Sequence, residues 1–116
     1  MSDALKIAQH YFDASNKSDF AAIERLFTDT TTYSSATTGM YLGKADIMTM
    51  QRTFHGKFSK LHWKMNSAEE IKPSMVQLDY NFTGTLSNDE VVTSSGLEYV
   101  IVYEGKIQHI EIRNKV

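Results

Sequence analysis

The side chains of this sequence that could carry chemistry are carboxylic acids and phenols. The chain has 116 residues, with no cysteine, six tyrosines and 14 Asp and Glu residues. The lack of cysteine excludes a disulfide framework, a cysteine nucleophile and thiolate ligands for zinc or an iron–sulfur cluster. Chemistry by the chain's own side chains is therefore expected to be proton transfer and hydrogen bonding, and Tyr11 and Glu98 are the candidates for it.

Tyr11 lies near the centre of the apolar face of a predicted helix. Ala4, Ile7, Ala8 and Ala14 fall on the same face at about 100° per residue, so the ring is expected to be buried. A buried phenol needs a hydrogen-bond partner. Its hydroxyl group should therefore reach either a pocket or a backbone carbonyl group in the core, and the sequence leaves both open.

Glu98 is a candidate acid or base whose surroundings depend on the register of the last predicted hairpin. The turn is predicted at Glu104-Gly105. A two-residue turn puts Glu98 on the face opposite Ile110 and Ile112, whereas a three-residue turn puts it on their face, which is expected to be the interior. In the interior, loss of solvent would raise the pKa of Glu98, as a general acid or base requires.

The sequence predicts no metal and no cofactor. His109 and Glu111 share one strand face, but two ligands at one strand spacing without a third nearby do not make a metal site. Residues 39–44 are one residue short of a phosphate-binding loop, and Ala45 stands where that motif needs Ser or Thr.

Charge and hydropathy argue against binding to nucleic acid or a membrane. The formal net charge is -2, which lacks the positive field typical of nucleic-acid binding. Basic residues near His55 and His62 alternate with aromatic residues at core spacing, so they are predicted to form a solvated face. No apolar run approaches the roughly 20 residues that span a bilayer, and no signal peptide is evident. A cytoplasmic location is expected.

The elements that must position these residues change in type midway along the chain. Apolar residues recur at helical spacing over about 3–15, 20–27 and 44–55, with a short strand over 30–35 and a loop from there to Gly43. Apolar residues then recur at every second position, as in strands, from Phe58 to the turn at Pro73 and over 76–83, 91–103 and 107–112. Helices followed by an antiparallel meander predict an α+β fold, in one domain over residues 1–116.

Several segments, in order, are similar to those of a known superfamily. They are Ala8–Ala14, Asn16–Phe20, Leu26–Asp29, Tyr41–Ile47 and Tyr103–Ile107. Together they resemble the nuclear transport factor 2-like superfamily, and in particular its SnoaL-like and ketosteroid-isomerase-like branches, over essentially the whole chain. The resemblance implies a cystatin-like cone, in which N-terminal helices pack on a strongly curved, mostly antiparallel sheet around a pocket. It also implies a homodimer formed through the outer face of the sheet.

The resemblance transfers to this chain only in part. Tyr11 matches the tyrosine that stabilises an oxyanion in the isomerase branch, and the second acid of that branch falls at Glu98 or Tyr99. The aspartate that serves as its general base falls on Ser35, or on Ser34. A neutral serine cannot remove a proton from carbon, so ketosteroid isomerisation is not expected.

Two hypotheses for function follow. One is an enzyme without a cofactor, of isomerase, cyclase or dehydratase type, that acts on a small hydrophobic or cyclic molecule through Tyr11 and Glu98. The other is a non-catalytic binding or dimerisation domain on the same fold. Besides these two residues, the expected pocket is largely apolar and aromatic, although the same residues could fill a solid core. It comprises Tyr33, Ser35, Met50, Phe54, Trp63, Tyr80, Phe82 and Ile110.

Overall fold

The first helix buries the face on which small and aromatic residues recur. A computed structural model describes residues 3–115, and in it α1 (Asp3–Asn16) buries Ala8, Tyr11 and Phe12. Asp19 begins the second helix, because its Oδ1 accepts a hydrogen bond from the Ala22 amide. The helices are α1, α2 (Phe20–Arg25) and α3 (Lys44–His55); the strands are β1 (Thr32–Ser35), β2 (Gly39–Leu42), β3 (Phe58–Lys72), β4 (Met75–Leu86), β5 (Val91–Tyr103) and β6 (Lys106–Asn114).

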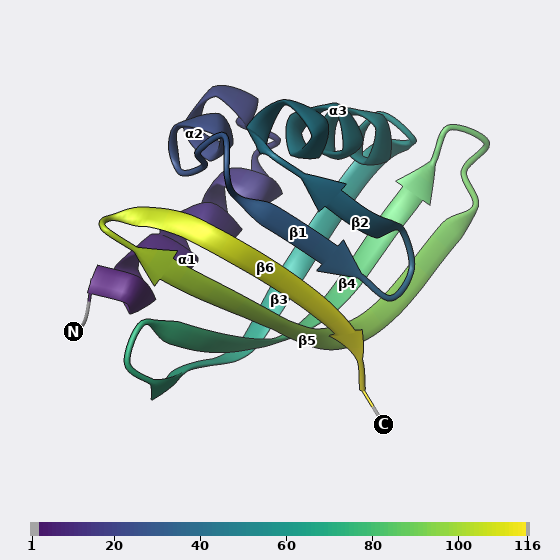
Figure 1. Cartoon of the computed structure of the whole chain (residues 1–116). Coiled ribbons are helices and arrows are strands. Elements are labelled where there is room, and N and C mark those ends of the chain that lie inside the picture. Colours follow the sequence, from purple (N-terminus) through teal and green to yellow (C-terminus); the bar gives the residue numbers. More distant parts are fainter. Residues whose placement is uncertain (1–2, 116) are drawn as a thin grey trace.

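The six strands form one curved sheet that holds the helices on one side (Figure 1). Their order is β2-β1-β6-β5-β4-β3, in which β1 and β6 are parallel and every other neighbouring pair is antiparallel. The pairing of β3 with β4 shifts register at three places, and such bulges bend a strand and increase its twist. The predicted α+β cone with a curved, mostly antiparallel sheet is confirmed.

Strand β2 departs from the prediction of a loop between residue 35 and Gly43. Residues 39–42 pair with β1 in an antiparallel register, from Ser35 opposite Gly39 to Thr32 opposite Leu42. Four residues, of which three are exposed, show no hydrophobic alternation. The backbone pairing that defines this strand therefore had no signal in the spacing of apolar residues.

The basic residues around His55 are exposed, as predicted, but His55 itself is buried. Its side chain is enclosed by the rings of Phe20, Phe54 and Trp63, whose centroids lie 5.1–6.2 Å from the imidazole. Nδ1 lies 2.8 Å from the Ser18 hydroxyl, and Nε2 has no hydrogen-bond partner among the described residues. Burial lowers the pKa of His55 to about 4, so the imidazole is neutral at physiological pH.

The fully buried core lies between the helices and the inner face of the sheet. Ile23 and Ile47 from the helices, with Leu78, Val100 and Ile110 from the strands, are completely inaccessible to solvent. Ile110, which was expected to line the pocket, belongs to this core. No helix within residues 3–115 is long and apolar enough to cross a membrane.

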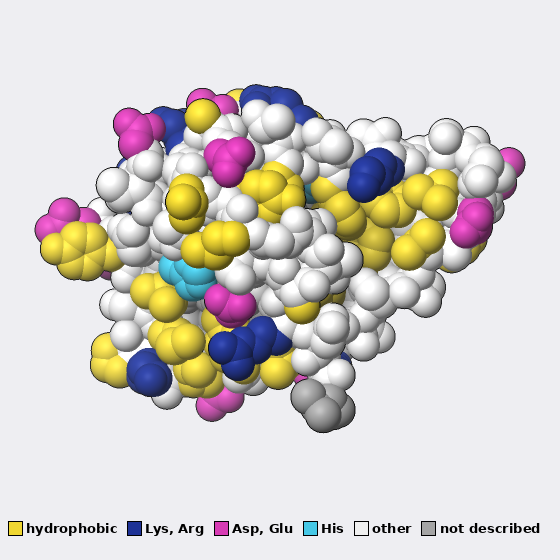
Figure 2. All heavy atoms as spheres, turned by 45° about the vertical axis from the view of Figure 1, so that its right-hand side comes forward, with side chains coloured by type: hydrophobic (Ala, Val, Ile, Leu, Met, Phe, Trp, Pro, Cys, Tyr) yellow, Lys and Arg dark blue, Asp and Glu magenta, His cyan; other side chains and the backbone are white. Residues whose placement is uncertain are grey.

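The outer face of the sheet mixes a polar network with exposed apolar side chains. His109 contacts the Thr32 hydroxyl through Nδ1 at 2.6 Å and the Glu111 carboxylate through Nε2 at 3.0 Å. On neighbouring β2, Met40 and Leu42 are 57% and 65% exposed. Figure 2 shows hydrophobic side chains in several groups over one side of the molecule, with charged side chains between them.

Candidate functional site

A tight turn and a bulge together determine which way Glu98 faces. Glu104 and Gly105 both have positive φ values, 49° and 78°, and form a two-residue turn that pairs Tyr103 with Lys106. On its own this turn would place Glu98 on the outer face. The turn is therefore the one that, by itself, predicts an outward Glu98.

The bulge reverses that outcome two residues after the turn. Val102 pairs with Ile107, but Ile101 pairs with His109, so Gln108 is an extra residue in β6. This one-residue shift brings Glu98 opposite Ile112, on the inner face. The two predicted alternatives, a two-residue turn with an outward Glu98 and a three-residue turn with an inward Glu98, did not include this bulge. The structure combines the two-residue turn with an inward Glu98.

Glu98 is a buried carboxyl group without a partner. Only 6% of the residue is exposed, and no described residue forms a hydrogen bond or an ion pair with it. Burial raises its pKa to about 7. Near neutral pH the protonated and ionised forms of the carboxyl group are therefore both well populated, so it can both donate and accept a proton. A solvated glutamate is almost entirely ionised at this pH.

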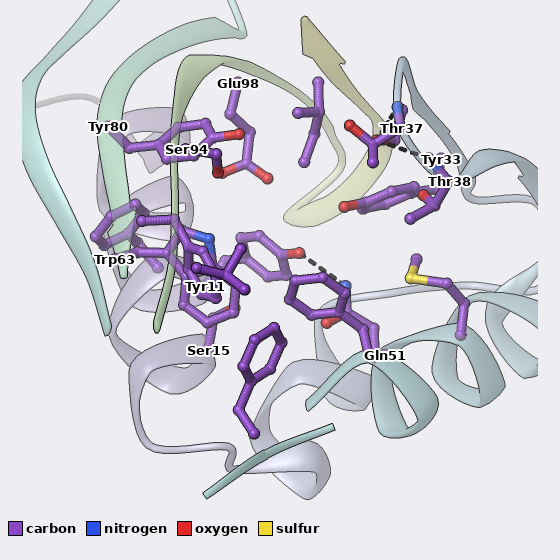
Figure 3. Close-up of a pocket in the computed structure, with 18 residues that line it drawn as sticks. Tyr11, Ser15, Tyr33, Thr37, Thr38, Gln51, Trp63, Tyr80, Ser94 and Glu98 are labelled. Atoms are coloured by element: carbon purple, nitrogen blue, oxygen red, sulfur yellow. Dashed lines mark hydrogen bonds between the residues drawn. The ribbon is translucent and has the colours of Figure 1, made fainter. Parts of the chain in front are cut away.

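Three tyrosines surround Glu98. In Figure 3 the hydroxyl groups of Tyr11, Tyr33 and Tyr80 and the carboxyl group of Glu98 point into one space. Burial, together with the nearby Glu98, raises the pKa of Tyr80 to about 12 and raises the pKa of Tyr11 and of Tyr33 as well. All three phenols are therefore protonated at physiological pH and available as hydrogen-bond donors.

The hydroxyl group of Tyr11 is oriented by Gln51 of α3. Gln51 Nε2 donates a hydrogen bond of 3.0 Å to the Tyr11 oxygen, and both side chains are buried. This bond occupies an acceptor position of the phenol and leaves its O–H free to donate toward the cavity. Gln51 was not predicted as a site residue; its only signal was a polar residue one turn after Ile47 on the buried face of α3.

These groups line a cavity of about 230 Å³ between α1, α3 and the sheet. Ser15 contributes a buried hydroxyl group that lies close enough to the Tyr11 hydroxyl to act on its pKa. All the residues predicted for the pocket line it except Ile110, and the lining also includes several that were not predicted. The full lining is Tyr11, Phe12, Ser15, Tyr33, Ser35, Thr37, Thr38, Met50, Gln51, Phe54, Phe58, Trp63, Tyr80, Phe82, Val92, Ser94, Glu98 and Ile112.

Ser35 supports the edge of the cavity. Its hydroxyl oxygen accepts hydrogen bonds from the amides of Thr37 and Thr38, at 3.2 and 3.4 Å. Both threonines line the cavity. Ser35 thus holds the β1–β2 loop in place, and its neutral hydroxyl group cannot remove a proton from carbon.

Gly96 gives Tyr80 the room to reach Glu98. The two residues are directly opposite each other in the β4–β5 pair. A Cβ atom on Gly96 would lie 2.8 Å from the Tyr80 hydroxyl oxygen and 2.7 Å from the Arg113 carbonyl oxygen, closer than real contacts allow. Any side chain at Gly96 would therefore displace the tyrosine that lies beside the carboxyl group.

Asn16 fixes Trp63 at the wall of the cavity. Its side-chain oxygen accepts a hydrogen bond of 2.7 Å from the Trp63 amide, and its side-chain nitrogen donates one of 2.9 Å to the Trp63 carbonyl. Because β3 is an edge strand, these two bonds replace part of a missing strand neighbour. They tie the end of α1 to the strand that carries the indole ring.

No group of three metal-binding side chains occurs among residues 3–115. The pair His109 and Glu111 lies on the outer face of the sheet, where Ser34 donates a second hydrogen bond to the Glu111 carboxylate at 3.2 Å. The hydroxyl groups of Thr32 and Ser34 therefore already bind this pair, and the pair lies apart from the cavity.

Comparisons with known proteins agree with this architecture. A family model described as "SnoaL-like domain" matches residues 8–110. No curated protein matches the sequence. The fold is similar to an NTF2-like protein of unknown function from Burkholderia pseudomallei, with a TM-score of 0.87 and 11% identity over 99% of this chain and 92% of the other.

Two further solved structures are similar in fold. One is a hypothetical protein of ketosteroid isomerase-like fold from Catenulispora acidiphila in complex with trimethylamine (TM-score 0.83, 13% identity, 95% of this chain and 85% of the other). The other is a putative SnoaL-like polyketide cyclase from Shewanella putrefaciens (TM-score 0.82, 14% identity, 97% and 89%). Identities this low establish a shared fold only.

Proposed function

The chain belongs to the SnoaL-like domain family, and from this premise we propose that its cavity binds a small hydrophobic or cyclic molecule and transfers protons on it without a cofactor. The observation that carries the proposal is Glu98, a buried and unpartnered carboxyl group in a largely aromatic cavity. The putative polyketide cyclase and the trimethylamine complex among proteins of this fold support small-molecule binding.

The chemistry that fits this arrangement is proton transfer next to a carbonyl group. Ionised Glu98 takes a proton from the carbon beside the carbonyl; the C–H electron pair forms a C=C bond, and the C=O π pair moves to the oxygen to give an enolate. The Tyr11 O–H donates a hydrogen bond to that oxygen and stabilises its charge. Protonated Glu98 then returns the proton to the same or another carbon, which completes an exchange or an isomerisation.

The alternative is a non-catalytic binding domain with the same cavity. Ser35 and Ser34 favour it, because the base of the isomerase branch matches one of these two neutral hydroxyl groups. Ser35 is bonded to the β1–β2 loop, and Ser34 to Glu111. In that case the polar groups of the cavity would orient a ligand and transfer no proton. Both functions require the cavity to be occupied, and they differ in whether protons move.

An exchange assay with a cyclic ketone separates the two functions. 2-Tetralone in D2O is followed by NMR for loss of its α protons, while its binding is measured by titration calorimetry. We expect exchange above the buffer rate with the wild-type protein, and its loss in Glu98→Gln and reduction in Tyr11→Phe with binding retained. If the wild-type protein binds 2-tetralone without exchange, the non-catalytic alternative is supported. If no small molecule binds, the proposal is refuted.

We also propose that two copies of the chain associate through the outer face of the sheet. Met40 and Leu42 expose most of their apolar side chains there, and exposed apolar groups of this kind often mark an association surface. Sedimentation at micromolar concentration should show a dimer that Leu42→Lys dissociates. A wild-type monomer at that concentration would contradict this association and would leave the cavity unaffected.

A further inference from the structure

We propose that the ligand of this cavity is a cation, specifically an organic ammonium ion attached to an apolar body. The inference rests on the proposed function only in that a small molecule occupies the cavity, and it does not require catalysis. It follows from the charge of the lining, from the kind of ring that surrounds Glu98 and from the division of the cavity into two ends.

The charge of the lining excludes anions and favours cations. Glu98 is the one carboxylic acid among the 18 lining residues, and none of them is Lys, Arg or His. An anionic ligand would find no opposite charge and would meet Glu98 in a region of low dielectric constant. A cation would supply the partner that Glu98 lacks within the protein, and so offset the cost of burying an ionised carboxyl group.

Aromatic rings surround the space in front of Glu98. Eight of the 18 lining residues are aromatic, and the rings of Tyr11, Tyr33 and Tyr80 lie around the carboxyl group in Figure 3. Aromatic rings gathered around one site are typical of ammonium recognition, and here the three tyrosines turn their hydroxyl groups toward the shared space. Phenol oxygens add acceptors for an N–H group.

The rest of the cavity suits the apolar body of such a ligand. Phe54, Phe58, Trp63 and Phe82 form a ring cluster with centroid separations of 4.9–6.2 Å. None of these four carries a charge, and all line the cavity. A ligand with an ammonium head near Glu98 and a hydrocarbon or aromatic body against this cluster therefore matches both ends.

Protonation distinguishes this ligand from a neutral one. An ammonium ion binds the ionised form of Glu98, so its affinity rises as pH rises through the pKa of about 7, and binding releases a proton. The groups that face Glu98 are Tyr11 from α1, Tyr33 from β1, Tyr80 from β4 and Ile112 from β6, and all are uncharged over this pH range. A neutral carbonyl ligand that accepts a hydrogen bond from protonated Glu98 would show the opposite dependence.

Three probes of similar size and different charge test the inference. Benzylamine, benzyl alcohol and benzoate are titrated into the whole protein by calorimetry between about pH 5.5 and pH 8.5, a range in which benzylamine stays protonated. At the upper end we expect benzylamine to bind about tenfold tighter than benzyl alcohol, and benzoate to bind weakest. The advantage of benzylamine should shrink toward pH 5.5 and disappear in Glu98→Gln.

A second measurement needs no variant. Calorimetry in two buffers of different ionisation enthalpy counts the protons exchanged on binding, and at pH 7 benzylamine should release about half a proton because Glu98 is about half protonated there. Benzyl alcohol should release none. A benzylamine affinity equal to or below that of benzyl alcohol at pH 8.5, or unchanged in a folded Glu98→Gln variant, would overturn the inference.

The outcomes separate the two proposals. If benzyl alcohol or 2-tetralone binds and benzylamine does not, the cavity is a small-molecule site for neutral ligands and only the inference on charge fails. If neither neutral molecule nor benzylamine binds, the proposed binding function fails, and the inference on charge fails with it.

Discussion

Glu98 and Glu111 lie on neighbouring strands and on opposite faces of one sheet. Glu98 faces the cavity, has no hydrogen-bond partner and has a pKa raised to about 7 by burial. Glu111 faces outward, where hydrogen bonds with His109 and Ser34 lower its pKa. The same side chain is thus an acid–base candidate on one face and a structural carboxylate on the other, and the difference lies in solvent access and partners.

The largest expected difference between the two glutamates is in proton transfer. Glu98→Gln should lower the rate of 2-tetralone exchange by about 100-fold or more, as expected for loss of a general base. Glu111→Gln removes a carboxylate of similar size from the other face, and it should leave the rate within a factor of about two of the wild-type value. Equal loss in both variants would show that the exchange depends on fold stability and not on the cavity.

The second prediction concerns stability as a function of pH. The pKa of Glu98 is higher in the folded state than its ordinary value of 4.5, so the folded state binds the proton more tightly. The contribution of Glu98 to the free energy of unfolding is complete below pH 4.5. It is lost as pH rises toward 7, which lowers the free energy of unfolding by about 3 kcal/mol in total. Glu98→Gln should therefore gain stability relative to the wild-type protein over this window, measured by urea unfolding at several pH values.

His55 makes that comparison necessary, because it acts in the opposite direction. Its pKa falls from 6.5 to about 4 on folding, so its contribution is present above pH 6.5 and is lost as pH falls toward 4. The two effects overlap in the wild-type protein, but the contribution of His55 is present in both proteins. It therefore cancels out of the difference between them, which leaves the contribution of Glu98. A difference in unfolding free energy that does not change with pH would contradict the raised pKa of Glu98.

The third prediction tests how the cavity holds its tyrosine beside the carboxyl group. Gly96→Ala places a methyl group against the Tyr80 hydroxyl and the Arg113 carbonyl, and should cost about 1–3 kcal/mol through overpacking. It should also weaken the binding of 2-tetralone. Ser95→Ala alters the adjacent exposed residue and should change the unfolding free energy by about 0.5 kcal/mol or less. Similar effects of the two variants would refute the role of Gly96.

The smallest expected effect is on the outer face. Glu111→Gln weakens the hydrogen bonds with His109 and Ser34 in a solvent-accessible setting, so the loss of unfolding free energy at pH 7 should be about 1 kcal/mol or less. Because the pKa of Glu111 is lowered on folding, this loss should fade as pH drops below the ordinary range of a glutamate. A larger loss at low pH than at neutral pH would contradict the assigned hydrogen bonds.

The spacing of apolar residues predicted most of the fold. The three helices and the long strands followed from it, because each buries one face along many residues. Strand β2 did not, since its pairing with β1 depends on backbone hydrogen bonds in four residues that are largely exposed. The burial of His55 had no such signal either, because it depends on aromatic rings from three elements that enclose the imidazole.

The sequence predicted most of the residues that line the cavity, but not the direction of Glu98 or the hydrogen bonds between lining residues. Tyr11 and the aromatic lining residues lie on faces that apolar spacing identifies. The direction of Glu98 depends on Gln108, whose bulge leaves no mark in hydropathy. The hydrogen bond between Gln51 and Tyr11 joins residues 40 positions apart, and no local pattern indicates such a pair.

The most direct test is to titrate Glu98 itself. Carbon-13 NMR of the side-chain carboxyl group, assigned by comparison with Glu98→Gln, reports its protonation state residue by residue. We predict a midpoint near pH 7 for Glu98 and one below the ordinary value of 4.5 for Glu111. A Glu98 midpoint near 4.5 would show a solvated carboxyl group and would contradict its role as the acid–base group of the cavity.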